Sequence, residues 1–498
     1  MASRVDVVPV ARLGGRSLLW FVLLELACMA GFLVFFATGN RTLAFVCLLG
    51  PLQLLAWVYL MRDAFWVLMF FNALVMLTPL ELLQRNYVMF GLFPGTALLL
   101  GFIAATRFLQ PGDSRPHRPP AVDFLPAAVL FLWVVLAAAN ALQTWGWKGW
   151  ASTNMLFATA VALEAIVIGW SYATVPRNLV QLRRLVYVLI VSTAFAAAAV
   201  YLLPPPRGEG GLLGGKTVVT PFGEASLNAF GTVLAAMSAM LVGLLVFEER
   251  VMARVLQVLL LVLFVVTMVL SKSRGAWFGF GIALLYVLLV SRSRRLLLVI
   301  ALALIVVLSV DVLRRVLLVR VAETSARDSS LMGRLVLWFY GWRVVRDNWL
   351  LGVGMDYFRA IKHHYGFPSP YGMVSLRYNS HNLFLEILAN LGVVGFGATI
   401  LMLGGALRRV LAKQVRRDHA GRGLALGIGA ALVALLMHGL WDAVIWQPGV
   451  VMLFAILVGL ASSLYYLIIA QTAERVDSAV STGDRPRSQS AVADSRIP

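Results

Sequence analysis

The chain has 498 residues, of which 60% are hydrophobic and only 13% are charged. Soluble domains are typically about 25% charged, so this composition excludes an ordinary soluble protein and predicts a polytopic membrane protein. The net charge of +19 would by itself fit a nucleic-acid-binding protein. The basic residues are spread over short segments between apolar runs, however, so we expect no nucleic-acid partner.

Apolar runs of about 17 to 25 residues recur along the chain, and this is the length that crosses a bilayer. We expect an all-α, polytopic transmembrane bundle of about 12 to 14 spans, with one large loop between late helices. The expected spans are 18–37, 42–60, 64–80, 90–107, 122–142, 153–174, 185–203, 227–247, 255–271, 276–291, 296–313, 382–407, 423–441 and 450–470.

These runs divide the chain into five parts. They are a cytoplasmic N-terminus (1–17), transmembrane helices (18–310), a large loop (311–380), C-terminal transmembrane helices (381–470) and a disordered cytoplasmic tail (471–498). The tail is rich in Ser, Arg, Asp and Ala and has little apolar surface to bury.

The basic residues predict the orientation of the chain. With the N-terminus inside, 25 of the 42 lysines and arginines fall in inner segments and 17 in outer ones, ten of these in the long loop. Without that loop the ratio is 25 to 7, since 17 minus ten leaves 7. Long loops count little in orientation, so the bias places both termini in the cytoplasm and the 311–380 loop outside.

The cysteines predict neither a disulfide framework nor a redox motif. The two cysteines, Cys28 and Cys47, both fall within expected spans, and no CxxC pair is present.

The first outer segment of interest is 203–227, which is rich in Gly and Pro and contains Arg207 and Lys216. It can be a flexible connector. Alternatively, glycine-rich backbone beside Arg and Lys can approach an anionic group closely.

A second basic segment, SKSRG at 271–275, joins two apolar runs with almost no loop between them. Arg274 must therefore lie at the headgroup level or point inward. It either snorkels to lipid phosphate or holds a substrate phosphate, for which its forked donors are suited.

The 311–380 loop contains LVLWFYGWRVV, whose apolar spacing predicts a helix that lies on the membrane or packs over the bundle. Four of its tyrosines, Tyr357, Tyr365, Tyr371 and Tyr378, suit either a sugar face or interfacial anchoring. His363-His364 lacks a third ligand at a recognisable spacing, so we expect no metal there.

The segment SHNLFLE at 380–386 places a histidine where the loop re-enters an apolar helix. His381 is either a general base or a structural residue beside a helix N-cap at Asn382. His438 and Asp442, one helical turn apart, are a further candidate pair, or a local hydrogen bond.

Four features in this order resemble the O-antigen ligase/polymerase family of bacterial envelope glycosyltransferases. They are the Gly/Pro-rich outer segment before Asn228, SRG at 273–275, NWLLGVGMDYF at 348–358 and HNLFLEILANLGVVG at 381–395. The resemblance covers roughly residues 200–410, and its most specific part is the HN element.

The resemblance implies transfer of a glycan from an undecaprenyl-pyrophosphate carrier to an acceptor hydroxyl, without a metal or other cofactor, at the periplasmic face of the bacterial inner membrane. It implies His381 as the catalytic residue and Arg274 as a ligand of the pyrophosphate. A second arginine of the family falls on Arg207, and Lys216 lies in the same segment. The acceptor is a glycolipid in a ligase and a growing polysaccharide in a polymerase, and membrane lipids surround both.

These residues make a coherent mechanism. Fixed cations stabilise the negative charge of a pyrophosphate leaving group, and a neutral imidazole removes the proton of the acceptor hydroxyl. Direct attack by the acceptor then predicts inversion of the anomeric centre. Glu386, about one turn past His381, is expected to support the ring or to face another helix, with Asn382 beside it. We expect Arg274 and His381 to line one outward-opening cavity, with Arg207 or Lys216 at its wall.

Two other classes remain open. A lipid-linked sugar transporter or flippase would favour charged residues near the midplane of several helices, and Glu25 and Glu164 are the only acids well inside expected spans. A non-catalytic scaffold does not account for basic residues and a histidine on one face.

Overall fold

The computed structural model describes residues 120–202, 217–220, 223–293, 329–367, 379–443 and 448–481, with a few single positions at 65–72 and 305–315. The expected spans 18–37, 42–60, 64–80, 90–107 and 296–313 lie outside the described residues, apart from those single positions.

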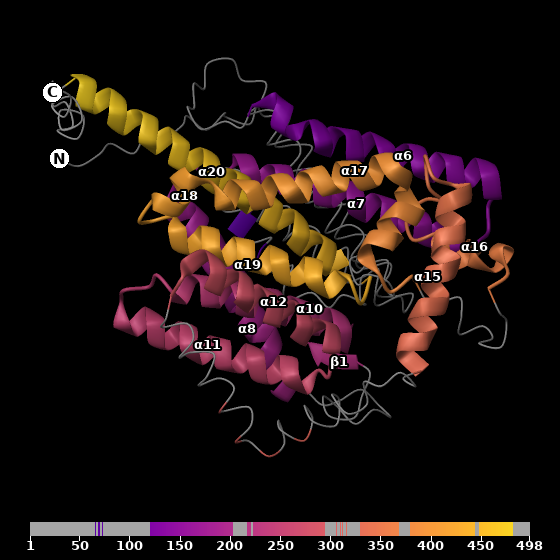
Figure 1. Ribbon diagram of the computed structural model, residues 1–498, viewed down its shortest axis with the longest axis horizontal. Coiled ribbons are helices and arrows are strands. Elements are labelled where there is room, and N and C mark those ends of the chain that lie inside the picture. The colour runs from indigo at the N-terminus through magenta and orange to yellow at the C-terminus, as the bar shows by residue number, and fades with distance from the viewer. Residues whose placement is uncertain are drawn as a thin grey trace, which may run out of the picture.

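Nine helices within the described residues are long and apolar enough to cross a membrane. They are α6 (Leu125–Trp145), α7 (Trp150–Thr174), α8 (Leu179–Leu202), α10 (Leu227–Leu245), α11 (Val251–Leu270), α12 (Arg274–Ser291), α17 (Leu383–Leu411), α19 (Arg422–Gly439) and α20 (Pro448–Ser481). Each coincides with one expected span. The all-α, polytopic membrane fold is therefore confirmed (Figure 1).

Helices α10 and α19 form the centre of the bundle. In α10, 94% of an 18-residue window is buried, whereas the corresponding share is 22% for α6 and for α12. A Cβ added at Gly243 of α10 would lie 2.4 Å from the backbone nitrogen of Gly427 of α19. Small residues thus let two backbones approach closely, as in other membrane bundles, where van der Waals packing holds helices together.

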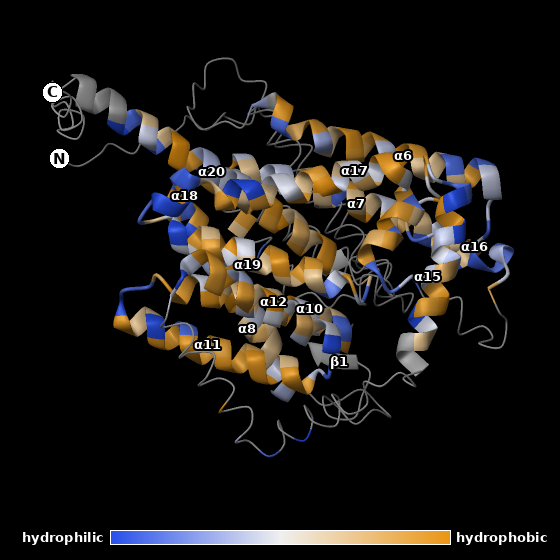
Figure 2. Cartoon of the chain, in the orientation of Figure 1, coloured by the Kyte–Doolittle hydropathy of each residue, from blue (hydrophilic) through white to orange (hydrophobic). Residues whose placement is uncertain are grey.

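The outside of the bundle is apolar where helices face lipid. Helix α11 exposes Val255, Leu256, Leu259 and Val262. Figure 2 shows hydrophobic colour along the long helices and hydrophilic colour near their ends. Exposed apolar side chains in a band along a helix indicate contact with lipid, not with water.

The two ends of the bundle differ in what they hold. Helices α15 (Ser329–Asp347) and α16 (Phe358–Ile361), followed by a 3-10 turn at Lys362–Tyr365, lie together at one end, and α18 (Lys413–Arg417) lies at the other (Figure 1). The helix expected within the 311–380 loop is therefore present as α15. Because α17 runs from the first end to the second, the two ends face opposite sides of the membrane.

Two segments differ from the sequence-based expectation. The tail was expected to be disordered from residue 471, but α20 continues to Ser481, so its first part is helical. The 203–227 segment contains an antiparallel hairpin of β1 (Thr217–Thr220) and β2 (Gly223–Ser226), which leads directly into α10.

Candidate active site at the end of the long loop

His381 lies in a tight turn at the point where the loop enters α17. Its φ of 49° is in the left-handed region, which few residues other than Gly, Asn and Asp adopt readily. Its backbone N–H donates to Oδ1 of Asn379 at 3.1 Å. Strained backbone that neighbouring contacts hold in place is common at functional sites.

The next residue, Asn382, begins α17 as its N-cap, as expected. Its side-chain oxygen accepts from the Leu385 N–H at 3.0 Å, and its side-chain nitrogen donates to the Leu440 carbonyl at 3.2 Å. Asn379 similarly donates to the carbonyl of Ala443 at 3.2 Å. The turn around His381 is thus fixed both to α17 and to the segment after α19.

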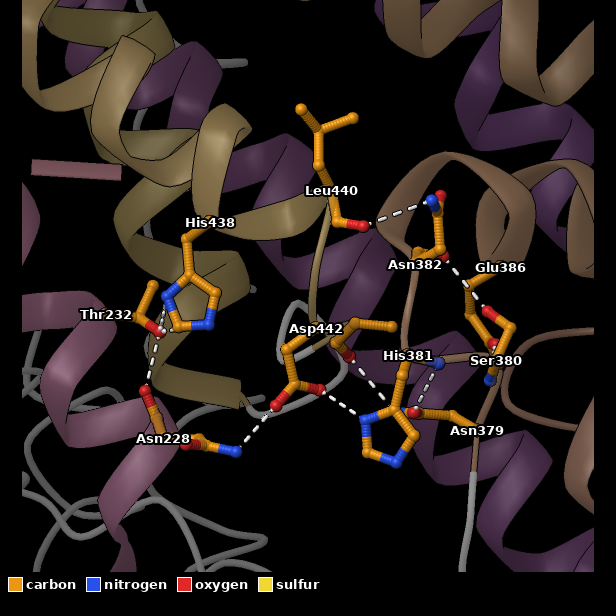
Figure 3. A network of polar contacts seen from close by, with 11 residues as sticks. Asn228, Thr232, Asn379, Ser380, His381, Asn382, Glu386, His438, Leu440 and Asp442 are labelled. Carbon is orange, nitrogen blue, oxygen red and sulfur yellow. Dashed lines mark hydrogen bonds and ion pairs between the residues drawn. The ribbon is translucent and has the colours of Figure 1, made fainter. Parts of the chain in front are cut away.

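The imidazole of His381 pairs with Asp442, which comes three residues after the end of α19. Nδ1 of His381 lies 2.8 Å from Oδ1 of Asp442, and the other oxygen of that carboxylate accepts from Nδ2 of Asn228 at 2.7 Å (Figure 3). An Nδ1–H that donates to a carboxylate assigns the lone pair of the neutral ring to Nε2. The His381 side chain is 23% exposed and that of Asp442 is 8% exposed, so the base is reachable and its partner is sheltered.

The carboxylate stays charged although it is buried. Burial raises the pKa of the Asp442 carboxyl, but the hydrogen bond from His381 and the nearby positive charges more than offset this. The pKa therefore lies below its usual value. One of those charges is Arg334 of α15, so a basic residue of the long loop acts on this site.

His438 has a different partner from the one that its spacing suggests. Its Nδ1 lies 2.7 Å from Oγ1 of Thr232, whose hydroxyl also lies 2.7 Å from the Asn228 carbonyl. Of the two alternatives for His438 and Asp442, the local hydrogen bond is formed, from the Asp442 N–H to the His438 carbonyl at 3.1 Å, whereas the side chain of Asp442 bonds His381 and Asn228. His438 is completely buried and serves to join α19 to α10.

The SRG segment lies beside His438. Ser273 is the N-cap of α12, accepting from the Ala276 N–H at 3.4 Å. A Cβ added at Gly275 would lie 3.0 Å from Nε2 of His438, so only glycine lets α12 approach α19 this closely. Arg274, the residue before Gly275, is the first residue of α12 and is half-buried. Its role toward phosphate stays a prediction.

The other two expected phosphate ligands, Arg207 and Lys216, lie outside the described residues. The hairpin that follows Lys216 leads to Asn228, in the first turn of α10. Because Asn228 donates to Asp442, the 203–227 segment ends at the same polar network (Figure 3).

A break in α17 holds the loop in place. At Gly392 the backbone adopts φ 63° and ψ −171°, which only glycine accommodates well. The carbonyls of Ala389 and Asn390 are therefore released from the helix, and they accept from Val353 at 3.0 Å and from Gly354 at 2.9 Å. The GVG segment of the loop is thus hydrogen-bonded to the LANLG segment of the helix.

Glu386 supports the turn and not the ring. Its carboxylate accepts from the Ser380 N–H at 2.6 Å and from Nδ2 of Asn390 at 3.2 Å. The partner of the His381 ring is Asp442, so the expectation that Glu386 supports the imidazole gives way to a contact with the backbone one residue earlier.

The loop tyrosines are not equivalent. Tyr357 is completely buried, which excludes it as a sugar platform. The hydroxyl of Tyr365 accepts from the side chain of Asn348 at 2.8 Å. Tyr371 and Tyr378 lie outside the described residues.

A cavity of about 1020 Å³ lies between α6, α7, α17 and α20, with Arg408 and Arg409 at one end and Met355 at the other. Neither Arg274 nor His381 lines it. The expected shared cavity of these two residues stays a prediction.

The SRG, GVG and HN motifs that the sequence singles out all lie within a stretch that matches a known family. Residues 259–400 match the family model described as O-antigen ligase. Over this stretch the chain is similar to O-antigen ligases. The match supports membership of the O-antigen ligase/polymerase family, whose members act on a lipid-linked glycan and an acceptor. No curated protein matches this chain.

For Asp442, the sequence did not predict the side-chain contact with His381. It lies 61 residues from His381, beyond the matched segment, and its spacing of four from His438 suggested a local pair. The sequence did contain one indication of this contact: Asp442 follows the end of an expected span, on the same side of the membrane as His381.

Proposed function

We propose that this O-antigen ligase-type membrane glycosyltransferase moves a glycan from undecaprenyl pyrophosphate to an acceptor hydroxyl, with His381 as general base. The observation that carries the proposal is the hydrogen bond of 2.8 Å between His381 and Asp442. It orients a partly exposed imidazole at the end of the loop. A scaffold would have no need of such a pair, and a transporter would favour charges near the midplane.

The reaction is a single displacement. Nε2 of His381 takes the proton of the acceptor hydroxyl while the oxygen bonds to the anomeric carbon. The bond from that carbon to the pyrophosphate oxygen breaks, and its electron pair leaves with the lipid pyrophosphate. Attack from the opposite face inverts the anomeric centre. The imidazolium that forms is stabilised by the carboxylate of Asp442, as in other carboxylate–histidine pairs.

The leaving group needs positive charge. Arg274 is proposed to bind the pyrophosphate bidentately, with Arg207 or Lys216 as further ligands, and these cations do the work of a divalent ion. Arg274→Lys keeps the charge but not the fork of donors, and we expect it to impair transfer severely. EDTA should leave the rate unchanged, and strict dependence on a divalent ion would reject the arginine mechanism.

The site is proposed to face the periplasm across the bacterial inner membrane. Arg346 and Arg417 are both exposed and lie at opposite ends of the bundle. In a protein whose Cys28 and Cys47 are replaced by Ser, an impermeant maleimide added to intact spheroplasts should label Arg346→Cys and not Arg417→Cys. The reverse pattern would place His381 in the cytoplasm and reject the proposed reaction.

Transfer is tested with purified protein, an undecaprenyl-pyrophosphate glycan and two acceptors. A ligase forms product with a core glycolipid, whereas a polymerase extends a second lipid-linked repeat unit. We propose the ligase, in line with the matched family, and product formed only with the second acceptor assigns the polymerase.

A further inference from the structure

The cavity between α6, α7, α17 and α20 takes no part in the proposed reaction, because neither Arg274 nor His381 lines it. Its volume of about 1020 Å³ is comparable with that of the larger ligand pockets in proteins. It extends along α17 from Ile387 to Arg409, which at 1.5 Å per residue is a length of about 33 Å. This length is close to the thickness of the hydrocarbon core of a bilayer, so the cavity is long enough for an extended acyl chain.

The two ends of the cavity differ in how open they are. At the end near the long loop it is lined by Met355, Ile387 and Leu391, which are all buried. At the arginine end it is lined by Leu401 and Leu411, which are 66% and 38% exposed. Helix α6, which forms one wall, is among the least buried of the spans that the structure describes. A ligand therefore enters from lipid at the arginine end, and its chain points toward the closed end.

The open end carries a net positive charge. Of the described residues that line the cavity, the charged ones are Arg408, Arg409 and Asp123, so two positive charges and one negative charge give +1. Asp123 lies in the 3-10 turn Ala121–Phe124 that precedes α6, and it forms an ion pair of 2.9 Å with Arg409. The Arg409 guanidinium also lies 6.0 Å from the ring centroid of Tyr466. Arg409 is thus held in place with its charge balanced, and the exposed Arg408 supplies the net charge.

We propose that the cavity binds an anionic glycerophospholipid of the cytoplasmic leaflet, with an acyl chain among the four helices and the phosphate at Arg408. Basic pockets between membrane helices at the cytoplasmic side suit anionic headgroups, and a guanidinium binds a phosphate through two parallel hydrogen bonds. Figure 1 shows the four helices together on one side of the bundle, with α6 at its edge. The proposed function contributes only the orientation of the chain in the membrane.

Two other anions fit the cavity less well. The carrier lipid of the proposed reaction would place its pyrophosphate near His381, at the end where buried residues such as Met355 close the cavity. A free phosphate ion would be bound by Arg408 but would leave the apolar part of the cavity empty. A cation at the open end of a long apolar interior matches a lipid of the cytoplasmic leaflet.

The test measures lipid binding to the delipidated full-length protein in detergent. Native mass spectrometry follows the first bound lipid while phosphatidylglycerol, or phosphatidylcholine with the same acyl chains, is added. We expect the wild type to bind phosphatidylglycerol about fivefold more tightly, which is the effect of one basic residue near an anionic headgroup. Arg408→Gln should remove this preference. The matched control is Arg417→Gln, which removes an exposed arginine at the same end that does not line the cavity.

A second charge variant should change binding in the opposite direction. Asp123→Asn removes the carboxylate that balances Arg409, so the open end gains a second uncompensated positive charge. Phosphatidylglycerol should then bind about fivefold more tightly than to the wild type, with little change for phosphatidylcholine. A loss of packing at this end would weaken the binding of both lipids, so the sign of the effect identifies the charge.

The apolar part of the site is tested separately. Gly404 lines the cavity, and a Cβ added there has nothing within 4 Å, so Gly404→Leu places its side chain in the cavity without a clash. It should weaken the binding of both lipids by about tenfold, which corresponds to the loss of about two buried methylene groups. Gly397→Leu serves for comparison, since Gly397 also has open space around an added Cβ but does not line the cavity.

Each outcome supports or overturns the proposal. Equal binding of the two lipids by the wild type, or equal effects of Arg408→Gln and Arg417→Gln, overturns it. Displacement of the bound lipid by glycerol phosphate would assign a site for a free anion, and stronger displacement by undecaprenyl phosphate than by phosphatidylglycerol would assign the carrier. Both results overturn it. The arginine variants change exposed side chains and keep the test decisive if Gly404→Leu does not fold. No step measures glycan transfer, so failure of the lipid site leaves the proposed function standing.

Discussion

The first half of α17 is held at two places that differ in kind. At Gly392 the helix is broken, and backbone groups of the GVG segment replace its missing hydrogen bonds. At His381, just before the helix begins, side chains of Asn379, Asn382 and Asp442 make the connections. The first place is buried and rigid, whereas the second exposes a titratable ring.

The difference indicates that the two motifs have separate roles, one in holding the loop and one in orienting the His381 ring. Backbone contacts at the break fix the loop and tolerate little change, since a Cβ at Gly392 would lie 2.1 Å from the Leu350 carbonyl. The contacts at His381 fix one ring against one carboxylate. Substitutions at the break should therefore lower stability most, and substitutions at His381 should lower activity most.

The largest effect is expected for His381→Ala. Loss of the base should reduce transfer by about 10²–10⁴-fold while the protein stays folded, although the loss of the pair with Asp442 lowers the unfolding temperature slightly. Because the left-handed backbone at this position disfavours alanine, His381→Asn serves as a second variant that adopts this conformation readily. Turnover and detergent-solubilised thermal unfolding check both, and full activity in either would falsify the mechanism.

A smaller loss is expected for Asp442→Asn. An amide in place of the carboxylate leaves the ring poorly oriented, and we expect transfer to fall by about 10–100-fold. Because the folded pKa of Asp442 lies below 3.8, the stability that the pair contributes is fully present above that value and is lost as the pH falls through the folded pKa. The difference in unfolding free energy between variant and wild type should therefore vanish in acid.

The neighbouring histidine provides the control for Asp442. Thr232→Val removes the hydroxyl that bonds His438 and should cost about 1–3 kcal/mol of stability. Turnover per folded molecule should stay close to that of the wild type. A larger catalytic loss in Thr232→Val than in Asp442→Asn would indicate that His438, and not His381, is the base.

The sequence predicted the nine described spans because each is one uninterrupted apolar run, which depends on local composition alone. It also predicted the N-cap at Asn382, since the cap and the N–H from which it accepts are three residues apart. It could not predict that Asp442 bonds His381, because that contact depends on how α17 and α19 pack. Nor could it predict the contact between Val353 and Ala389, since hydrogen bonds that cross a helix break have no periodic signature.

The break in α17 offers a matched pair of glycines. Gly392→Ala should cost about 1–3 kcal/mol from backbone strain alone, and more if the GVG segment is displaced. Gly397 lies in the same helix with nothing within 4 Å of an added Cβ, so Gly397→Ala should be neutral or stabilising by up to about 1 kcal/mol. Chemical or thermal unfolding in detergent measures both. Equal effects of the two variants would show that the break does not hold the loop.

The smallest effect is expected at the N-cap, where two functions of one side chain can be separated. Asn382→Ala removes the cap and the bond to the Leu440 carbonyl and should cost about 0.5–2 kcal/mol. Asn382→Asp keeps an acceptor for the Leu385 N–H but cannot donate to Leu440. If the cap is what matters, Asn382→Asp is as stable as the wild type. If the hydrogen bond between the ends of α17 and α19 matters more, the stability of Asn382→Asp resembles that of Asn382→Ala. Turnover then falls as well, because Leu440 lies two residues before Asp442, the carboxylate that orients His381.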